Sequence, residues 1–233
     1  MRKNFPNAWS GIILTGMLFF LVACTIMFPS PEPTAQPITL VMPTEVPLFT
    51  RITLTSIPQH EDAQSPNYTI DTQTPVLEGS SDQRVEGFNE LMRSIVQEEV
   101  DGFKDWMAEM PAEPVTGGSF LGINFSQVSP PGDMISVKFT VVFYNDGAAH
   151  PGQYSRAVTY NLESGAEVSL AQLFLPGADY LKVISTFCVS NLLSRDIGFD
   201  DQWMSGADPT PENYRNWNVT ADGLLITFDP YQV

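Results

Sequence analysis

The sequence predicts an α+β domain, in which an antiparallel β-sheet, made of a meander and a hairpin, carries two helices on one face. Two segments with helical spacing of apolar residues, 82–107 and 180–192, alternate with β-prone segments. Three β-prone segments within 120–162 follow one another through short turns, which is typical of antiparallel strands. The chain has 233 residues. We place a single domain at residues 67–233, which is long enough to bury one hydrophobic core.

The N-terminal residues have the pattern of a secretory signal. Two basic residues precede an apolar run that ends in Leu21-Val22-Ala23, and Cys24 follows directly. A basic start, a short apolar core and small residues before a cleavage point are typical of exported proteins. A cysteine after this triplet resembles the lipobox of bacterial lipoproteins, in which the thiol is lipidated and becomes the new N-terminus. We expect a signal peptide at 1–23 and lipidation of Cys24, with an uncleaved span over 8–28 as the alternative.

Residues 24–66 are predicted to form a disordered tether rich in Pro and Thr. Proline occurs eight times between residues 25 and 66, and the scattered apolar residues follow no sustained period. Frequent proline removes backbone donors and disfavours both helices and central strands. We therefore expect a partly extended linker that holds the domain away from the membrane.

The ordered domain is expected to start with a strand at 68–77, followed by a helix at 82–107. Pro75 predicts that this strand is an edge strand or contains a break. Ser80 and Gln83 have the spacing of a capping box, which predicts the helix start. The apolar stripe of the helix comprises Val85, Phe88, Met92, Ile95 and Phe103, and the acids Glu86, Glu90, Glu98 and Asp101 point away from it. These acids are interpreted as a solvated face.

The remaining elements follow in order along the chain. Strands are expected at 120–128, 134–145 and 154–162, separated by turns rich in Pro, Gly and Asp. An apolar face from Tyr180 to Leu192 predicts the second helix. Residues 217–228 then form a closing hairpin around a Gly turn.

The chain is strongly acidic. It contains 11 Lys and Arg against 27 Asp and Glu, a net charge of −16. Removal of residues 1–23 would leave 9 basic and 27 acidic residues, a charge of −18. Such a chain repels nucleic acid and anionic lipid and would attract a cationic partner, but solubility at a cell surface is the simpler explanation of the charge.

The sequence offers few residues for catalysis. His60 lies in the predicted tether and His150 in a turn, so no two-histidine metal site is expected, and no cofactor motif is present. We interpret His150 as a turn residue that bonds to its own loop, and Cys188 as a buried small hydrophobe. Asp200 and Asp201 could hold a cation weakly. We therefore expect no enzymatic activity.

The candidate binding surface lies between the second helix and the hairpin. Its aromatic residues are Phe199, Trp203, Tyr214 and Trp217, which stand among acids and prolines. Exposed aromatic residues of this kind are frequent in recognition surfaces. The alternative is that these rings fold under the loop and cap the core.

Four segments carry a resemblance to a known family. They are Tyr68-Thr69-Ile70 with Pro75 and Gly79, Gly147-Ala148-Ala149-His150-Pro151, Asn161-Leu162-Glu163-Ser164-Gly165, and Asn216-Trp217-Asn218-Val219-Thr220 with Phe228-Asp229-Pro230-Tyr231. In order and spacing these segments resemble the extracytoplasmic domain of the anti-sigma factor RsiV and of the N-terminal part of the peptidoglycan deacetylase PdaC. The resemblance covers nearly all of residues 68–233.

The resemblance implies a binding function. The RsiV domain binds lysozyme, so a cationic, cell-wall-associated ligand is expected here. Only residues 1–7 could lie in the cytoplasm, which argues against sigma-factor control, and PdaC's deacetylase domain has no counterpart. Relatives continue beyond the stretch that ends here at Val233, so we expect a C-terminally truncated domain. We predict a lipid-anchored extracytoplasmic lipoprotein with a non-catalytic binding domain, and a peptidoglycan-acting hydrolase or its accessory as the alternative.

Overall fold

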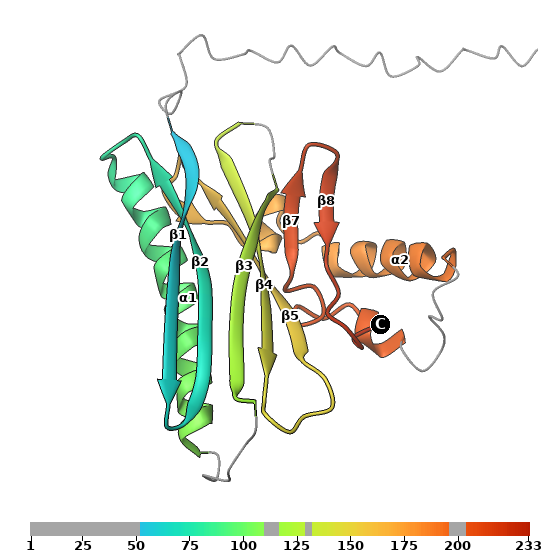
Figure 1. Ribbon diagram of the computed structural model, residues 1–233. Helices are drawn as coiled ribbons and strands as arrows, with labels where there is room; N and C mark the ends of the chain where they lie inside the picture. Colours follow the sequence, from blue (N-terminus) through green and yellow to red (C-terminus); the bar gives the residue numbers. More distant parts are fainter. Residues whose placement is uncertain (1–51, 110–116, 129–131, 196–203) are drawn as a thin grey trace, which may run out of the picture. The chain divides into compact units, whose positions relative to one another are not determined.

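The computed structural model describes residues 52–109, 117–128, 132–195 and 204–233 (Figure 1). All of them lie in one compact unit, Val46–Val233. The elements are β1 (Thr53–Gln64), β2 (Asn67–Glu78), α1 (Gln83–Glu109), β3 (Ser119–Val128), β4 (Met134–Tyr144), β5 (Gly152–Asn161), β6 (Ala166–Glu167), the 3₁₀ helix η1 (Leu170–Leu173), α2 (Tyr180–Leu193), the 3₁₀ helix η2 (Met204–Ala207), β7 (Trp217–Thr220) and β8 (Gly223–Ile226). No helix within these ranges is long and apolar enough to cross a membrane.

The strands form a six-stranded sheet and a separate hairpin. The sheet has the order β1-β2-β3-β4-β5-β6, and β7 pairs with β8. β2 and β3 are parallel and are connected through α1, whereas the other neighbours are antiparallel. The predicted α+β class and the antiparallel meander β3-β4-β5 are confirmed.

Strand β1 corrects the predicted extent of the tether. Thr53–Gln64 pairs with β2 along its whole length, so residues 53–66 belong to the domain rather than to a disordered segment. The sequence pattern did not predict this strand, because most of its side chains are polar and exposed and no alternation of buried residues results. Pro58 is tolerated because β1 is the edge of the sheet. Residues 24–51 lie outside the described ranges.

Pro75 predicted that β2 would be an edge strand or contain a break, but β1 forms the edge of the sheet instead. β2 is an inner strand, but its pairing with β3 covers only residues 68–72. Pro75 therefore lies beyond the segment where β3 would need its backbone N–H, and it faces only Ser56 of β1.

Helix α1 covers one face of the sheet and closes the main core (Figure 1). The predicted apolar stripe is buried, and Glu86, Glu90, Glu98 and Asp101 are exposed as expected. The predicted capping box does not form. Instead the Asp82 carboxylate accepts the backbone N–H of Arg84 at 2.9 Å, and hydrogen bonds from Arg84 lower the pKa of this carboxyl.

The second helix packs at a different place from α1. A second core joins α2 to the hairpin through Leu170, Ile184, Cys188, Tyr214 and Trp217. Val137 belongs to the α1 core, and its neighbour Ser136 points to the opposite face, where it accepts a hydrogen bond from Asn218 of β7 at 2.8 Å. The hairpin therefore lies on the sheet face opposite α1, and α2 packs on the hairpin rather than beside α1.

Candidate functional site: an aromatic pocket with an acidic rim

A pocket of about 310 Å³ lies between α1 and the sheet. Phe103 and Trp106 line it from α1, and Leu121, Phe143 and Tyr154 line it from β3, β4 and β5; Glu99 and Gly102 complete its wall. The α1 residues belong to the C-terminal half of the helix, and the strand residues lie near the start of β3, the end of β4 and the start of β5. These parts of α1, β3, β4 and β5 lie toward the end of the domain that points down in Figure 1.

Its aromatic side chains form a continuous wall. The ring centroids of Phe103 and Trp106 are 6.0 Å apart, those of Trp106 and Phe143 are 6.3 Å apart, and those of Phe143 and Tyr154 are 6.1 Å apart. The Trp106–Phe143 contact is edge-to-face, a favoured aromatic geometry. Because each ring is held by its neighbours, the wall is formed before any ligand arrives.

One edge of the pocket carries a carboxylate. The Tyr154 hydroxyl donates a hydrogen bond to Glu99, and an Arg156 N–H donates to Glu98 at 2.8 Å and to Glu99 at 3.2 Å. Burial and the neighbouring Glu99 carboxylate raise the pKa of Tyr154, so its phenol keeps the proton and remains a donor. The site thus combines an apolar aromatic wall with a fixed acidic group.

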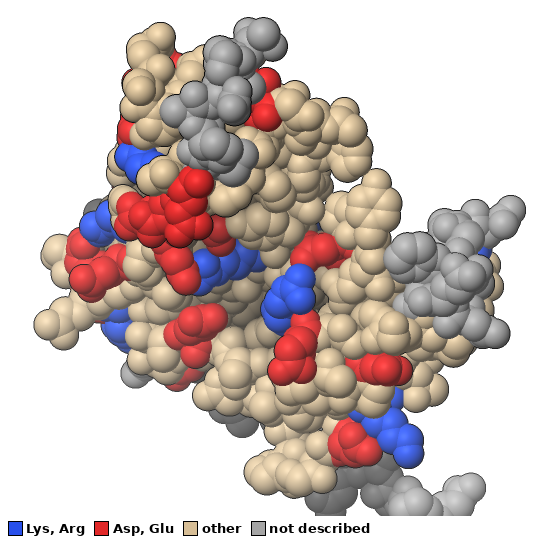
Figure 2. Space-filling model, turned by 90° about the horizontal axis from the view of Figure 1, so that it is seen from below, with Lys and Arg blue, Asp and Glu red and all other residues tan. Residues whose placement is uncertain are grey.

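The C-terminal part of α1, beside the pocket, is acidic, which is unfavourable for a helix terminus. Residues 97–109 contain five acids against the single cation Lys104, and the last turn of the helix has no basic residue. A helix C-terminus carries partial negative charge, so acids there cost stability. Lys104 is paired with Glu61 at 2.7 Å. Figure 2 shows this end of the molecule, where red acidic side chains form several groups among fewer blue ones.

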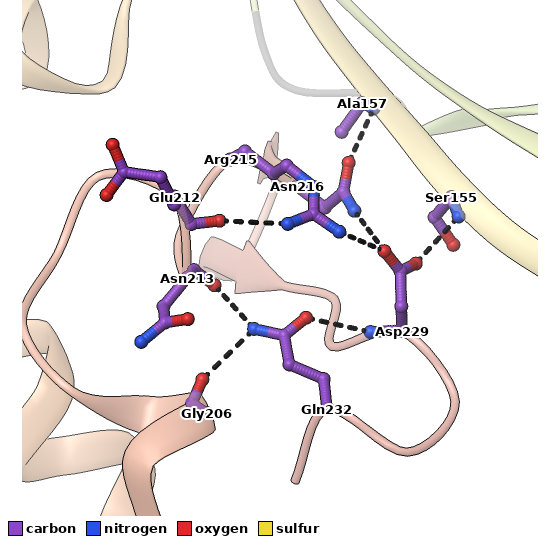
Figure 3. A network of polar contacts seen from close by, with 9 residues as sticks. All are labelled: Ser155, Ala157, Gly206, Glu212, Asn213, Arg215, Asn216, Asp229 and Gln232. Atoms are coloured by element: carbon purple, nitrogen blue, oxygen red, sulfur yellow. Dashed lines mark hydrogen bonds and ion pairs between the residues drawn. The ribbon is translucent and has the colours of Figure 1, made fainter.

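A polar network holds β5, and with it the pocket's Tyr154, in place (Figure 3). The Asp229 carboxylate accepts the backbone N–H of Ser155 at 2.7 Å and an N–H of Arg215 at 2.6 Å. Asn216 accepts the backbone N–H of Ala157 at 3.2 Å. These are backbone hydrogen bonds made at the edge of β5, and Ser155 and Ala157 directly follow Tyr154 and Arg156, so they hold the stretch of strand that carries both side chains.

The same network ties down the C-terminal turn. Gln232 donates to the carbonyl oxygens of Gly206 and Asn213, both at 3.0 Å, and accepts the backbone N–H of Asp229 at 3.1 Å (Figure 3). A side chain on Gly206 would collide with the Gln232 backbone, so this glycine permits the close approach.

Two residues of the predicted aromatic surface, Tyr214 and Trp217, are described by the structure, and both are buried. Tyr214 is 1% exposed and Trp217 is 7% exposed, and both belong to the second core. The Tyr214 hydroxyl donates to the Ala207 carbonyl at 2.6 Å. These two rings therefore cap the core, which was the alternative interpretation. Phe199 and Trp203 lie outside the described ranges.

The predicted histidines lie apart from the pocket. His150 is exposed in the β4–β5 connection, with Nδ1 3.0 Å from the Pro151 carbonyl oxygen. His60 lies on β1, 2.7 Å from Asp71 and 3.0 Å from Asp62, and these hydrogen bonds raise its pKa. Cys188 is buried, as expected.

The prediction that Asp200 and Asp201 could hold a cation weakly concerns residues that the structure does not describe. Cys24 also falls outside the described ranges. Within those ranges, no group of three or more His, Cys, Asp or Glu side chains is arranged to hold a metal ion.

The sequence did not predict the aromatic pocket. Its residues come from four separate elements, and each ring has the pattern of an ordinary core residue. The available signals were Glu99 beside the apolar stripe and the acids at the end of a long helix, which were interpreted only as a solvated face.

Comparisons with known proteins support the expected family resemblance. Residues 171–233 match the family model described as "Protein of unknown function (DUF3298)". The peptidoglycan-N-acetylmuramic acid deacetylase PdaC of Bacillus subtilis is 25% identical over 150 residues, which is 64% of this chain and 32% of PdaC. The esterase Rv3036c of Mycobacterium tuberculosis is 32% identical over 87 residues, which is 37% of this chain and 38% of the esterase.

A solved structure supports the fold. A DUF3298 family member from Bacteroides fragilis matches 78% of this chain and 91% of its own, with a TM-score of 0.54 and 13% sequence identity. The predicted resemblance to PdaC is confirmed as sequence similarity over 150 residues, and the solved structure supports the fold alone. The chain spans only about a third of the length of the curated relatives that it matches.

Proposed function

We propose that this chain, which carries a DUF3298 segment and is related to PdaC, is a non-catalytic binding module of the bacterial cell envelope. Its ligand is a cationic protein, and the aromatic pocket receives a Lys or Arg side chain of that protein. The pairing of Glu99 with an aromatic wall is the observation that carries this proposal.

The chemistry of the pocket favours a cation with an apolar stem. Aromatic faces attract ammonium and guanidinium groups, by about 0.5–1 kcal/mol at exposed sites and about 2 kcal/mol when desolvated. The alkyl stem of a Lys or Arg side chain matches the apolar wall, and its charged end would share the Glu99 carboxylate with Arg156. An anionic group would find Arg156 already paired with Glu98 and Glu99, and it would lie near the negative end of α1.

The acidic end of α1 supports the same ligand class. Acids at a helix C-terminus weaken the helix, and such departures from local stability rules tend to coincide with function. A field of this sign would also accelerate the encounter with a cationic protein, and salt would slow that encounter.

The proposal includes the location of the module. Similarity to a peptidoglycan deacetylase supports a place at the cell envelope. Lipidation of Cys24 would anchor the chain at the outer face of the cell membrane, where a cationic cell-wall enzyme such as lysozyme would be met. The signal-like N-terminal sequence supports this anchor.

Gly102 provides the test of the pocket. A Cβ at Gly102 would meet no atom within 4 Å, so Gly102→Leu can fill the pocket without a backbone clash. Gly102→Ala is the matched control, because both replacements favour the helix relative to Gly, whereas only leucine occupies the pocket. Residues 46–233, the compact unit, are titrated calorimetrically with lysozyme at moderate salt.

We expect Gly102→Leu to weaken lysozyme binding at least tenfold and Gly102→Ala to change it less than twofold. Glu99→Gln is expected to weaken binding several-fold, and Glu90→Gln, on an exposed face of the same helix, much less. No binding of lysozyme or of a tetralysine peptide by the unaltered domain would contradict the function. Binding that is insensitive to Gly102→Leu would contradict the site.

A second candidate function follows from the names of the relatives. One is a deacetylase and the other an esterase, which favours acyl-group hydrolysis as the alternative. Turnover of muropeptides or of a short-chain ester by residues 46–233 would support it and contradict the non-catalytic proposal. Turnover that persisted after joint replacement of His150, Asp200 and Asp201 would exclude those residues as catalysts.

A further inference from the structure

A second hollow lies between α2 and the β7–β8 hairpin. It has a volume of about 460 Å³, within the range of small-molecule sites. Its apolar lining includes Phe174, Ile184, Cys188, Leu192, Ile226 and Phe228. The lining residues of α2 run from Val183 to Leu192, so the groove follows about 14 Å of helix, and Arg195 lies just beyond the end of α2.

The rim of this groove is apolar although it faces solvent. Val183 is 67% exposed and Phe187 is 70% exposed, and Leu224 and Leu225 of β8 are exposed beside them. A helix with apolar residues around most of its circumference is normally buried. Contiguous exposed apolar surface marks a place where a ligand or partner binds.

The polar residues of the groove are confined to one end. Only Asn191 and Arg195 among its lining residues have polar side chains, and none is acidic, in a chain with 27 acids. Arg195 makes no ion pair with any residue that the structure describes. The groove therefore suits a ligand that is apolar along its length and anionic at one end.

We propose that this groove is a second binding site and that its ligand is a long-chain fatty acid. The acyl chain lies along α2 between Ile184 and Leu192 and is covered by the hairpin residues. The carboxylate is paired with the Arg195 guanidinium, which presents parallel N–H donors to carboxylates. An extended peptide fits less well, because its backbone N–H and C=O groups would find no partners along the apolar walls.

The fatty acid site does not depend on the cationic ligand of the aromatic pocket. The two hollows share no lining residue, and their charged groups have opposite signs. Failure of lysozyme binding therefore leaves this proposal standing, and the reverse is also true.

Cys188 allows the site to be tested directly, because it lines the groove and is the one cysteine of residues 46–233. Alkylation of its thiol by a maleimide is timed with and without hexadecanoate below its micellar concentration. We expect hexadecanoate to slow alkylation at least fivefold and hexadecylammonium to have less than a twofold effect. Calorimetry with hexadecanoate gives the affinity independently.

Arg195→Glu and Lys182→Glu form the matched pair of variants. Both reverse one exposed charge, at Lys182 within α2 or at Arg195 just beyond it, but Lys182 does not line the groove. We expect Arg195→Glu to weaken hexadecanoate binding at least tenfold and Lys182→Glu less than twofold. Absence of hexadecanoate binding, equal protection by hexadecylammonium, or occupation of the groove by an apolar helical peptide instead would overturn the proposal.

Discussion

Replacement of Asp229 by alanine should detach the C-terminal segment from β5. The carboxylate is largely buried, at 10% exposure, and binds the Ser155 N–H at 2.7 Å, an Arg215 N–H at 2.6 Å and the Asn216 amide at 3.3 Å. Loss of a hydrogen bond to a charged group costs about 1.5–3 kcal/mol, most of all where the donor is left unpaired. The exposed ion pair with Arg215 adds about 0–1 kcal/mol.

The Asn216 amide is buried and would also lose a partner, so the loss in free energy of unfolding sums to about 3–4 kcal/mol. For a domain of this size, that loss lowers Tm by about 10 °C. Urea unfolding of residues 46–233 measures it directly, and hydrogen exchange should show faster opening at the Ser155 amide.

Arg215→Ala is the matched control for this prediction. Arg215 is 57% exposed, so its removal should cost less than about 1 kcal/mol and leave the Ser155 amide protected. Asp229→Asn keeps an acceptor for Ser155 and should lie between the two. Equal losses for Asp229→Ala and Arg215→Ala would refute the reasoning, because the surface ion pair would then be the principal contact.

Three further predictions concern separate parts of the chain. The pKa of His60, measured by NMR, should lie above 6.5, because Asp71 and Asp62 stabilise its protonated form. Hydrogen-exchange protection of the β1–β2 hairpin around His60 should therefore be full below pH 6.5 and fall as pH rises through the folded pKa. An unchanged His60 pKa in Asp71→Asn would contradict this. Asn89→Ala should lower the free energy of unfolding by about 2–4 kcal/mol in urea, because it leaves the buried N–H and C=O of Leu77 without partners; a loss below about 1 kcal/mol would contradict it. Cys24→Ser should abolish labelling of the exported chain by a radioactive fatty acid, and persistent labelling would disprove the lipobox assignment.

Local patterns in the sequence predicted the elements with strong periodicity. Helix α1 buries Phe88 and Met92 as its apolar spacing required, and the turn-linked strands β3 to β5 pair as expected. Strand β1 could not be recognised because it is stabilised by pairing with β2 rather than by a buried face. Its polar residues carry no alternation signal.

The position of α2 and the two hollows depend on long-range packing. Phe187 has the spacing of a core residue but is exposed, because the hairpin covers only the neighbouring side of α2. Tyr214 and Trp217 resemble recognition residues in sequence but fill the second core. The aromatic pocket is made by rings from four elements, and only their arrangement separates it from ordinary core packing.

The most direct test of the account is an NMR titration of residues 46–233 with a tetralysine peptide, observed at the Trp106 indole N–H. We predict saturable shifts at Trp106 and at the backbone around Glu99 and Tyr154, retained in Gly102→Ala and absent in Gly102→Leu. Weak shifts spread over the acidic surface, with none at Trp106, would contradict the central claim that the aromatic pocket receives a cationic side chain.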